Sequence, residues 1–489
     1  MNVALLLASY PQLDESWNSY APLGLGYLAS YAQQRLGGVE FIADHRSGKI
    51  IEAKPDCVGV SFTSYNARYA AQEARKIKDA LNCPVIAGGI HVSAIPELLD
   101  PVFDCGVMGE GEETFVELLR LFQERKALPP ALPPATLAAI QGLAYRNEAG
   151  VVVRTPPRPH IEQLDQIGFP DRVLLQKRGP WSPEYVSFMT SRGCPYNCHF
   201  CSSKSHWGGR IRYHSVEHVL RECEGIASQF DPRQVFVFDD LFIANKERAK
   251  RILSGMRERR LFEGKDLRCF VRSNHLDDEI MQELVATGFR ILCMGFESAS
   301  EPVLEALNKR PRMAFHNRQA VELARKHGAL FSASFILGTP GETRDDILET
   351  FNFIESNAGV FLDVNVSFLM AFPGSKAWEW ANPQGITDRA MVDMAISPED
   401  IENEKDAILR RLPYLNEANV PREELYAHLQ TARLLAKSVA QSSQLRRDKA
   451  RLESALAQAH TPQYVAQAVP IRPVLWEKIK RRLFKKRTG

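Results

Sequence analysis

The sequence predicts an α/β protein in which two regions of alternating strands and helices precede a helical C-terminal segment. Residues 1–125 alternate short apolar runs with amphipathic ones, the pattern of a parallel sheet flanked by helices. A second alternating region begins near residue 184 and holds six strand–helix units. We expect domains over 1–125 and 181–385, a proline-rich linker with a hairpin over 126–180, and a helical region with a basic tail over 386–489.

The composition is that of an ordinary globular protein. The chain has 489 residues, 45% hydrophobic and 25% charged, and its formal charge of +2 gives no indication of nucleic-acid binding. No run approaches the roughly eighteen apolar residues of a membrane span, and Met1–Ala8 predicts a first strand rather than a signal peptide. Nine cysteines, dispersed except for one loop, favour a reducing cytoplasm over a disulfide scaffold.

The first region should contain five strands and three helices. The strands are Val3–Leu7, Val39–Ile42, Cys57–Ser61, Val85–Ala87 and Cys105–Met108, and the helices are Leu23–Arg35, Ala67–Ala80 and Glu112–Glu124. Ligands of such sheets bind beyond the carboxyl ends of the strands. The segments there are Ser61–Tyr65, Gly88–His91 and Gly109–Glu112, whose glycines allow close backbone approach to a ligand. Taken singly, paired glycines after a strand are more often tight turns.

The second region follows the linker, in which Leu143–Asn147 and Val151–Arg154 predict a hairpin. Its strands are Tyr185–Met189, Gln234–Phe238, Cys269–Arg272, Ile291–Phe296, Leu330–Leu337 and Asp363–Phe368. The helices between them are Ser215–Gln229 with Ser215 as N-cap, Lys246–Arg259, Asp277–Thr287, Val303–Leu307, Asn317–His327 and Thr343–Ser356. Arg422–Ser442 and Ser443–His460 predict a C-terminal helical pair.

Cys194, Cys198 and Cys201 lie in one loop directly after a predicted strand, four and then three residues apart. Thiolates at this density bind soft metals and hold iron–sulfur clusters. Three ligands are one fewer than a structural zinc site or a fully ligated cluster uses, so one iron would stay open for a small molecule. A zinc site with a distant fourth ligand, or three unrelated cysteines, is the alternative, but the restrictive spacing favours the cluster.

This spacing, with Phe200 just before the last cysteine, resembles the cluster loop of the radical S-adenosylmethionine (SAM) enzymes. The resemblance implies a [4Fe–4S] cluster whose open iron chelates the amino and carboxylate groups of SAM. Once reduced by an external donor of the flavodoxin or ferredoxin type, the cluster cleaves SAM to a 5′-deoxyadenosyl radical. The resemblance also implies that the six strand–helix units form a partial (β/α)6 barrel.

Chemistry in such a barrel belongs at the C-terminal ends of the strands. In this branch of the family an acidic pair, here Asp239-Asp240, takes the place of the Gly-Gly-Glu contact to the SAM amino group. The glutamate of a Gly-x-Glu-Ser motif, here Glu297, binds SAM, and a glycine such as Gly338 allows the backbone to lie next to adenine. A single charge at one strand end could equally be a solvated loop charge, and it is the whole set on one rim that favours a SAM pocket. The expected SAM contacts are Phe200, Asp239, Asp240, Arg272, Glu297, Ser298 and Gly338.

Four motifs of the first region, taken as a series, resemble the Rossmann-like cobalamin-binding domain of the B12-binding-domain-containing radical SAM proteins, among them the class B methylases. They are Pro22–Leu25, Pro55–Gly59, Gly88–His91 and Gly109–Glu112. Asp44–Gly48 is misspaced for the signature that supplies a cobalt-ligating histidine in other B12 proteins, so cobalamin would bind without that ligand. The expected cobalamin contacts are Ser61, Thr63, Tyr65, Gly88, Gly89, His91, Gly109, Glu110, Gly111 and Glu112.

The sequence predicts smaller roles for the remaining cysteines and histidines. Cys57, Cys83 and Cys105 could hold a second cluster, as in tRNA methylthiotransferases, but they fall at strand starts opposite the ligand turns, so we expect buried residues. Cys223, Cys269 and Cys293 should also be core residues, and His199 should point away from the cluster. His206 and Trp207 either line a substrate cavity or cover the cluster loop.

The combined resemblance implies methylation of an unactivated carbon, with one SAM remethylating cobalamin and a second generating the radical. The substrate and the catalytic residues are not identified. A radical rearrangement or cyclisation, a tRNA methylthiotransferase and a corrinoid-binding sensor are the alternatives. The basic segment Trp476–Arg487 could contact an anionic membrane surface, although a solvated chain end is the simpler interpretation.

Overall fold

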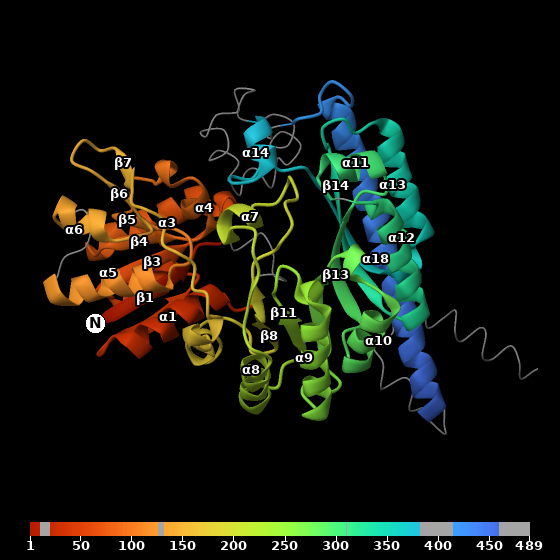
Figure 1. Ribbon diagram of the computed structural model, residues 1–489, viewed down its shortest axis with the longest axis horizontal. Coiled ribbons are helices and arrows are strands. Elements are labelled where there is room, and N and C mark those ends of the chain that lie inside the picture. The colour runs from red at the N-terminus through yellow and green to blue at the C-terminus, as the bar shows by residue number, and fades with distance from the viewer. Residues whose placement is uncertain (10–19, 126–131, 310, 382–413, 459–489) are drawn as a thin grey trace, which may run out of the picture.

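The computed structural model describes residues 1–9, 20–125, 132–309, 311–381 and 414–458. Two sheets lie side by side, with the N-terminal domain in red and orange next to a barrel in yellow, green and cyan (Figure 1). The basic tail and most of the Leu128–Pro134 connector lie outside the described residues. Within the described part of the chain we find no helix with the length and apolarity of a membrane span.

The N-terminal sheet has the strand order β2-β1-β3-β4-β5-β6-β7, and its first five strands are parallel. Side chains of β1 alternate between the two faces: Val3 and Leu5 pack with helices α1 and α5, and Ala4 and Leu6 pack with α3. The strands are β1 (Asn2–Leu7), β2 (Glu40–Asp44), β3 (Cys57–Ser61), β4 (Val85–Gly88) and β5 (Cys105–Val107). The helices are α1 (Leu23–Arg35), α2 (Ser47–Ala53), α3 (Ala67–Leu81), α4 (Ile90–Ala94) and α5 (Glu112–Arg125).

The hairpin that the sequence assigns to a linker belongs to this sheet. Strand β6 (Leu143–Arg146) pairs antiparallel with β5, and β7 (Val152–Arg154) then forms the edge. A short helix, α6 (Pro134–Ala139), precedes it. The hairpin joins the sheet because β5 would otherwise leave its backbone groups unpaired along one edge.

The second sheet is parallel throughout, in the order β15-β14-β13-β12-β11-β8, as expected for a partial barrel. Its strands are β8 (Tyr185–Phe188), β11 (Gln234–Val237), β12 (Asp266–Val271), β13 (Ile291–Glu297), β14 (Leu330–Leu337) and β15 (Phe361–Phe368). Short strands β9 (Ser191–Arg192) and β10 (Arg212–Tyr213) pair after β8. The helices are α7 (Ser203–Trp207), α8 (Val216–Gln229), α9 (Lys246–Glu258), α10 (Asp278–Thr287), α11 (Glu301–Ala306), α12 (Met313–His327), α13 (Arg344–Ser356) and α14 (Lys376–Ala381). As predicted, the Ser215 side chain caps α8 by accepting from His218 N.

The predicted C-terminal helical pair is instead one continuous helix, α18 (Arg422–Gln458). It packs along β15 and beside α13 of the barrel (Figure 1), and its Leu425, Leu429 and Val439 are buried in the barrel core. Ser442 and Ser443 were the expected break, but the sequence there has neither proline nor glycine to end a helix. Packing against the barrel therefore carries the helix through this point.

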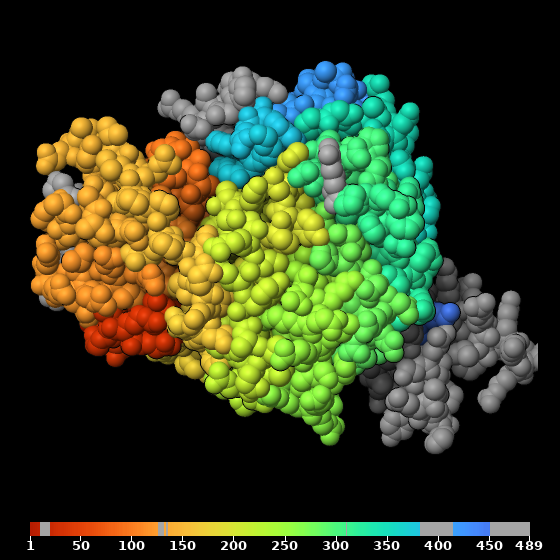
Figure 2. Space-filling model, viewed as in Figure 1, coloured from red at the N-terminus to blue at the C-terminus, as the bar shows by residue number. Residues whose placement is uncertain are grey.

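Aromatic side chains join the two domains. Tyr20 lies edge-on to Tyr185, Phe236 and Phe238 of the barrel, with ring centroids 5.9, 5.8 and 5.1 Å away. Tyr65 meets Phe372 in the same way at 5.4 Å. The space-filling view shows the red and orange domain against the yellow flank of the barrel (Figure 2). This contact brings the carboxyl-end turns of the N-terminal sheet next to the cysteine loop.

Candidate active site between the cysteine loop and the glycine turns

The three cysteines of the loop are accessible to solvent. Cys194 and Cys198 are half-buried and Cys201 is exposed, whereas the other six cysteines are buried, as expected. All nine thiols are free. Three uncrosslinked thiols in one loop are the donor set that a [4Fe–4S] cluster with one open iron requires. His199 turns away from the loop as predicted, because its Nδ1 lies 2.8 Å from Ala306 O.

Asp239 holds the chain just before this loop. Its Oδ1 accepts from the backbone N–H groups of Thr190 and Ser191 at 2.6 and 3.2 Å, and its Oδ2 accepts from their hydroxyls at 2.5 and 2.6 Å. The side chain is completely buried. All the acceptor positions of the carboxylate are thus used, which leaves none for the SAM contact that the sequence predicts.

Asp240, the other half of the acidic pair, is exposed beside the cysteine loop. It accepts one hydrogen bond, from Ser203 Oγ at 2.8 Å, two residues after Cys201. Its second oxygen is free to accept from a ligand within the described structure. The two neighbouring aspartates therefore differ: one fixes the backbone, and one can contact a ligand at the loop.

Arg272 directly follows β12, the third strand of the barrel, and lies against the loop. Its Nη1 donates to Cys198 Sγ at 3.2 Å and its Nε to Asn274 Oδ1 at 2.9 Å. Its guanidinium carbon lies 3.9 Å from the centroid of the Tyr196 ring. The Nη2 group is buried without a hydrogen-bond partner in the structure, so it can donate to a ligand carboxylate.

Glu297 occupies a strained position at the end of β13. Its φ of 64° is left-handed, and the β13–β14 register shifts at this point. The buried carboxylate pairs with Lys309 Nζ at 3.1 Å. Strain of this kind is typical of ligand sites, so Glu297 keeps the position expected of a SAM contact, although one oxygen already has a cation partner.

The other predicted SAM residues have different surroundings. Ser298 is completely buried, and its hydroxyl lies 3.0 Å from Thr350 Oγ1. Gly338 lies under the C-terminal segment: a Cβ there would stand 2.9 Å from Tyr414 Cε2. Phe200 packs in an apolar cluster with Leu307 and Leu369. These residues shape the barrel mouth through packing.

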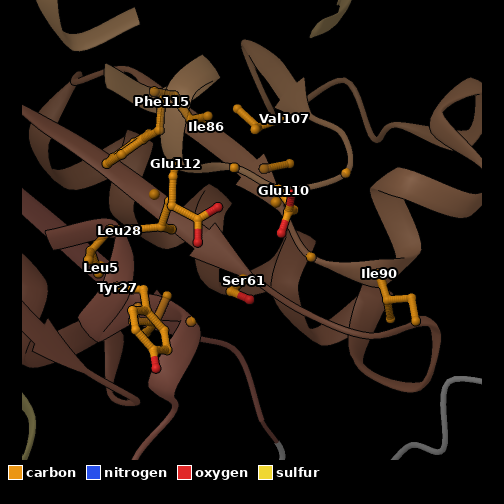
Figure 3. Close-up of a pocket in the computed structure, with 18 of the residues that line it drawn as sticks. Leu5, Tyr27, Leu28, Ser61, Ile86, Ile90, Val107, Glu110, Glu112 and Phe115 are labelled. Atoms are coloured by element: carbon orange, nitrogen blue, oxygen red, sulfur yellow. The ribbon is translucent and has the colours of Figure 1, made fainter. Parts of the chain in front are cut away.

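A cavity of about 290 Å³ lies beyond the carboxyl ends of β1, β3, β4 and β5 (Figure 3). This volume is at the lower end of small-molecule pockets, which span roughly 300–1,000 Å³. Gly24, Gly88 and Gly109 line it, and a Cβ added at Gly24 or Gly109 would meet no atom within 4 Å. Such a mostly apolar cradle of bare backbone fits one arm of a large ligand such as cobalamin.

Six of the ten expected cobalamin contacts are glycines or glutamates of the two turns, and they line this cavity along with Ser61. Gly89 is needed there, because its φ is 100° and a Cβ would lie 2.5 Å from Phe62 O. Thr63, Tyr65 and His91 lie elsewhere. Tyr65 contacts the barrel, and His91 lines a second cavity, with Nδ1 3.0 Å from Ser64 Oγ.

Glu110 and Glu112 point into the space bordered by Ser61 and Tyr27 (Figure 3), yet both carboxylates are paired with arginines of the barrel domain. Arg192 Nη1 and Nη2 lie 2.7 Å from Glu110 and Glu112, and Arg212 Nη1 lies 2.8 Å from Glu110. Burial alone would raise the pKa of Glu110, but Arg192 and Arg212 outweigh it and hold the pKa below its usual value. These glutamates thus join the domains as well as lining the cavity.

The opposite wall of the cavity comes from the barrel, and its residues were not among the predicted cobalamin contacts. They are Met189, Arg192, His206 and Trp207. His206 Nδ1 is buried and unpartnered, and burial lowers the pKa of His206 to about 4. From the sequence, His206 and Trp207 could either line a substrate cavity or cover the cluster loop. In the structure both line this cavity. Their only sequence signal was their place directly after the cysteine loop.

Comparison with known proteins agrees with this two-part site. Residues 188–354 match the Radical SAM superfamily, and residues 15–119 match the B12 binding domain. An uncharacterized methyltransferase of Pyrococcus horikoshii is 34% identical over 383 residues, which cover 74% of this chain and 78% of that protein. The chain belongs to the B12-binding radical SAM family. Its cofactors are a [4Fe–4S] cluster, SAM and cobalamin, and it is an enzyme of the cobalamin-dependent radical SAM methyltransferase kind.

More distant proteins share the fold or part of the sequence. The radical SAM methyltransferase TsrM of Kitasatospora setae, solved with cobalamin and a [4Fe–4S] cluster, has a TM-score of 0.64 at 21% identity, over 78% of this chain and 75% of that one. The cobalamin-dependent enzyme OxsB has a TM-score of 0.61 at 17% identity, over 95% and 70%. An anaerobic magnesium-protoporphyrin IX monomethyl ester cyclase of Rubrivivax gelatinosus is 27% identical, and the match spans 68% of this chain and 61% of the cyclase.

Proposed function

We propose that this enzyme methylates an unactivated, sp3 carbon of its substrate. One observation carries the proposal: the glycine-lined cavity borders the cysteine loop, because Arg192, two residues before Cys194, and His206, five residues after Cys201, both line the cavity. A methyl donor in the cavity and a radical generator at the loop would therefore lie next to each other. A substrate carbon held there could be activated and methylated without leaving the site.

In this proposal Cys194, Cys198 and Cys201 hold the cluster. Asp240 accepts from the SAM amino group, and the free Nη2 of Arg272 donates to the SAM carboxylate. Glu297 supports the same pocket from β13. Ser61 and the two glycine turns hold cobalamin, with His206 and Trp207 on the facing wall.

When bound, the cluster and SAM supply a radical, and cobalamin supplies a transferable methyl group. The residues of this chain orient these groups and keep water out. Tyr20 and Tyr65 close the domain boundary with aromatic contacts, and the Arg192–Glu110 pair closes it with buried charges. Exclusion of water protects a radical from unproductive quenching.

A radical cyclisation or rearrangement is the second candidate, because one relative is named a cyclase. The two functions differ in the fate of the SAM methyl group. Methylation places it on the product, whereas cyclisation leaves it on the methionine released when SAM is cleaved.

The test is anaerobic reconstitution of the whole chain with iron, sulfide and hydroxocobalamin, followed by metal analysis. We expect about four irons and one cobalt per chain. The C201A variant should lose most of its iron, and C269A, which alters a buried cysteine, should keep it. After a low-potential reductant has converted the bound cobalamin to the Co(I) state, transfer of label from methyl-labelled SAM to it tests the methylating half-reaction without the substrate. Four irons without cobalt would overturn methylation and favour cyclisation or rearrangement.

A further inference from the structure

We propose that Arg272 raises the reduction potential of the cluster by donating a hydrogen bond to the Cys198 thiolate. The inference rests on the proposed function, in which Cys198 is a cluster ligand. Arg272 Nη1 stands 3.2 Å from Cys198 Sγ, and the side chain is 7% exposed. Nearby charge, burial and hydrogen bonds to the sulfurs all set the potential of such clusters.

Two residues hold Arg272 in this position. Asn274 Oδ1 accepts from its Nε, and the ring of Tyr196 lies under its guanidinium at 3.9 Å. Tyr196 belongs to the cysteine loop itself, and its hydroxyl accepts from Asn274 Nδ2 at 3.0 Å and lies 2.6 Å from His275 Nε2. The guanidinium is therefore clamped between the loop and the end of β12, so its N–H group stays directed at the sulfur.

The charge of Arg272 is not neutralised by a carboxylate in the described part of the chain. Every hydrogen-bond acceptor that the structure gives it is a sulfur or an amide oxygen. The other buried arginines of this region, Arg192 and Arg212, are both paired with glutamates. Arg272 thus presents a full positive charge to the sulfur with little solvent to screen it.

The charge of Arg272 affects the one-electron reduction of the cluster. An external low-potential donor of the flavodoxin or ferredoxin class is oxidised by one electron, and the cluster takes that electron up. The added negative charge spreads onto the thiolate sulfurs, so the cation and its N–H···S bond stabilise the reduced form more than the oxidised form. Arg272 is in this sense a positioning and tuning residue, separate from any contact that its Nη2 makes with SAM.

The test is a redox titration of the reconstituted protein without SAM, followed by electron paramagnetic resonance of the reduced cluster. We expect R272M to lower the equilibrium constant for cluster reduction by about tenfold, which is a fall of 59 mV for a one-electron couple. R272K, which keeps a charge and a donor, should fall between R272M and the wild type. R268M, which removes an arginine paired with Asp266 on the same strand, should leave the potential unchanged.

Equal potentials in R272M and the wild type, at equal iron content, would overturn the inference and leave the proposed function standing. If R272M cannot retain the cluster, R272K and R272Q replace it. A potential for R272K that is no higher than that of R272Q then overturns the role of the charge. A wild-type chain that takes up no iron would overturn the proposed function, and the inference with it.

Discussion

Arg192 donates a 2.7 Å hydrogen bond to Glu110 across the boundary between the two domains. Glu110 belongs to a turn that lines the glycine cavity, and Arg192 stands two residues before the first cysteine of the loop. Both side chains are less than a tenth exposed. One ion pair therefore ties the position of the proposed cobalamin site to that of the proposed cluster site.

Replacing Glu110 should destabilise this boundary. E110Q leaves Arg192 and Arg212 with one carboxylate fewer between them, and breaking a buried pair in this way costs about 3–5 kcal/mol. E113Q, in the first turn of the helix that follows Glu110, removes an exposed partner of Arg158 and should cost under about 1 kcal/mol. Urea unfolding of the apo chain measures both. Equal midpoints for the two variants would contradict a structural role for the ion pair.

The neighbouring aspartates should separate folding from SAM binding. D239N weakens four hydrogen bonds to a buried charge and should lower stability by about 2 kcal/mol or more, along with iron content after reconstitution. D240N should keep the stability and the iron content of the wild type but bind SAM more weakly. The Asp240 carboxylate has one hydrogen-bond partner in the described structure, Ser203, and its other oxygen is the proposed SAM contact. Iron analysis, thermal unfolding and equilibrium binding of SAM distinguish the two. A D240N variant that binds SAM normally would remove Asp240 from the proposed SAM site.

Filling the glycine cavity should weaken cobalamin binding without harming the fold. G24L places a side chain from the first turn of α1 into open space, and leucine favours the helix more than glycine does. We expect affinity for hydroxocobalamin to fall at least about tenfold, or 1.4 kcal/mol. G48L is the matched control, since Gly48 is also in a helix with no atom near its Cβ position but does not line the cavity. Equal binding by both variants would place cobalamin elsewhere.

Glu342 should make stability fall as the pH rises. The side chain is 1% exposed, and burial raises the pKa of Glu342 to about 8, although the N–H groups of Gly338 and Thr339 favour its charged form. In the unfolded chain the pKa of a glutamate is about 4.3, so as the pH rises the unfolded state releases this proton before the folded state does. The free energy of unfolding therefore falls between about pH 4.3 and 8.

The E342Q variant cannot ionise and should lose this dependence. Relative to the wild type it should gain more stability at about pH 8 than at about pH 5, by up to a few kcal/mol. Asp346 and Tyr414, which face Glu342, are unchanged in this comparison. Thermal unfolding at the two pH values is the measurement, and parallel pH profiles for the two proteins would show that Glu342 is already ionised in the native state.

Local patterns in the sequence were enough for the fold class and for the proposed chemistry. The helix Leu23–Arg35 and the strands Cys57–Ser61 and Leu330–Leu337 have the predicted bounds, because their apolar periodicity and their flanking residues are local features. The spacing of Cys194, Cys198 and Cys201 is likewise set within eight residues. The family resemblance and its cofactors follow from these segments alone.

Only the tertiary structure decided what the individual polar side chains contact. Asp239 lies at the strand end where a SAM ligand was expected, but Thr190 and Ser191, some fifty residues earlier, occupy its carboxylate. Glu110 lies in the predicted ligand turn, but its partner is an arginine 82 residues away. Such pairings depend on how two sheets meet, because a buried charge must find its counter-charge wherever the fold supplies one. The sequence determined where the strands end, and the packing of the two domains decided which side chains at those ends remain free for ligands.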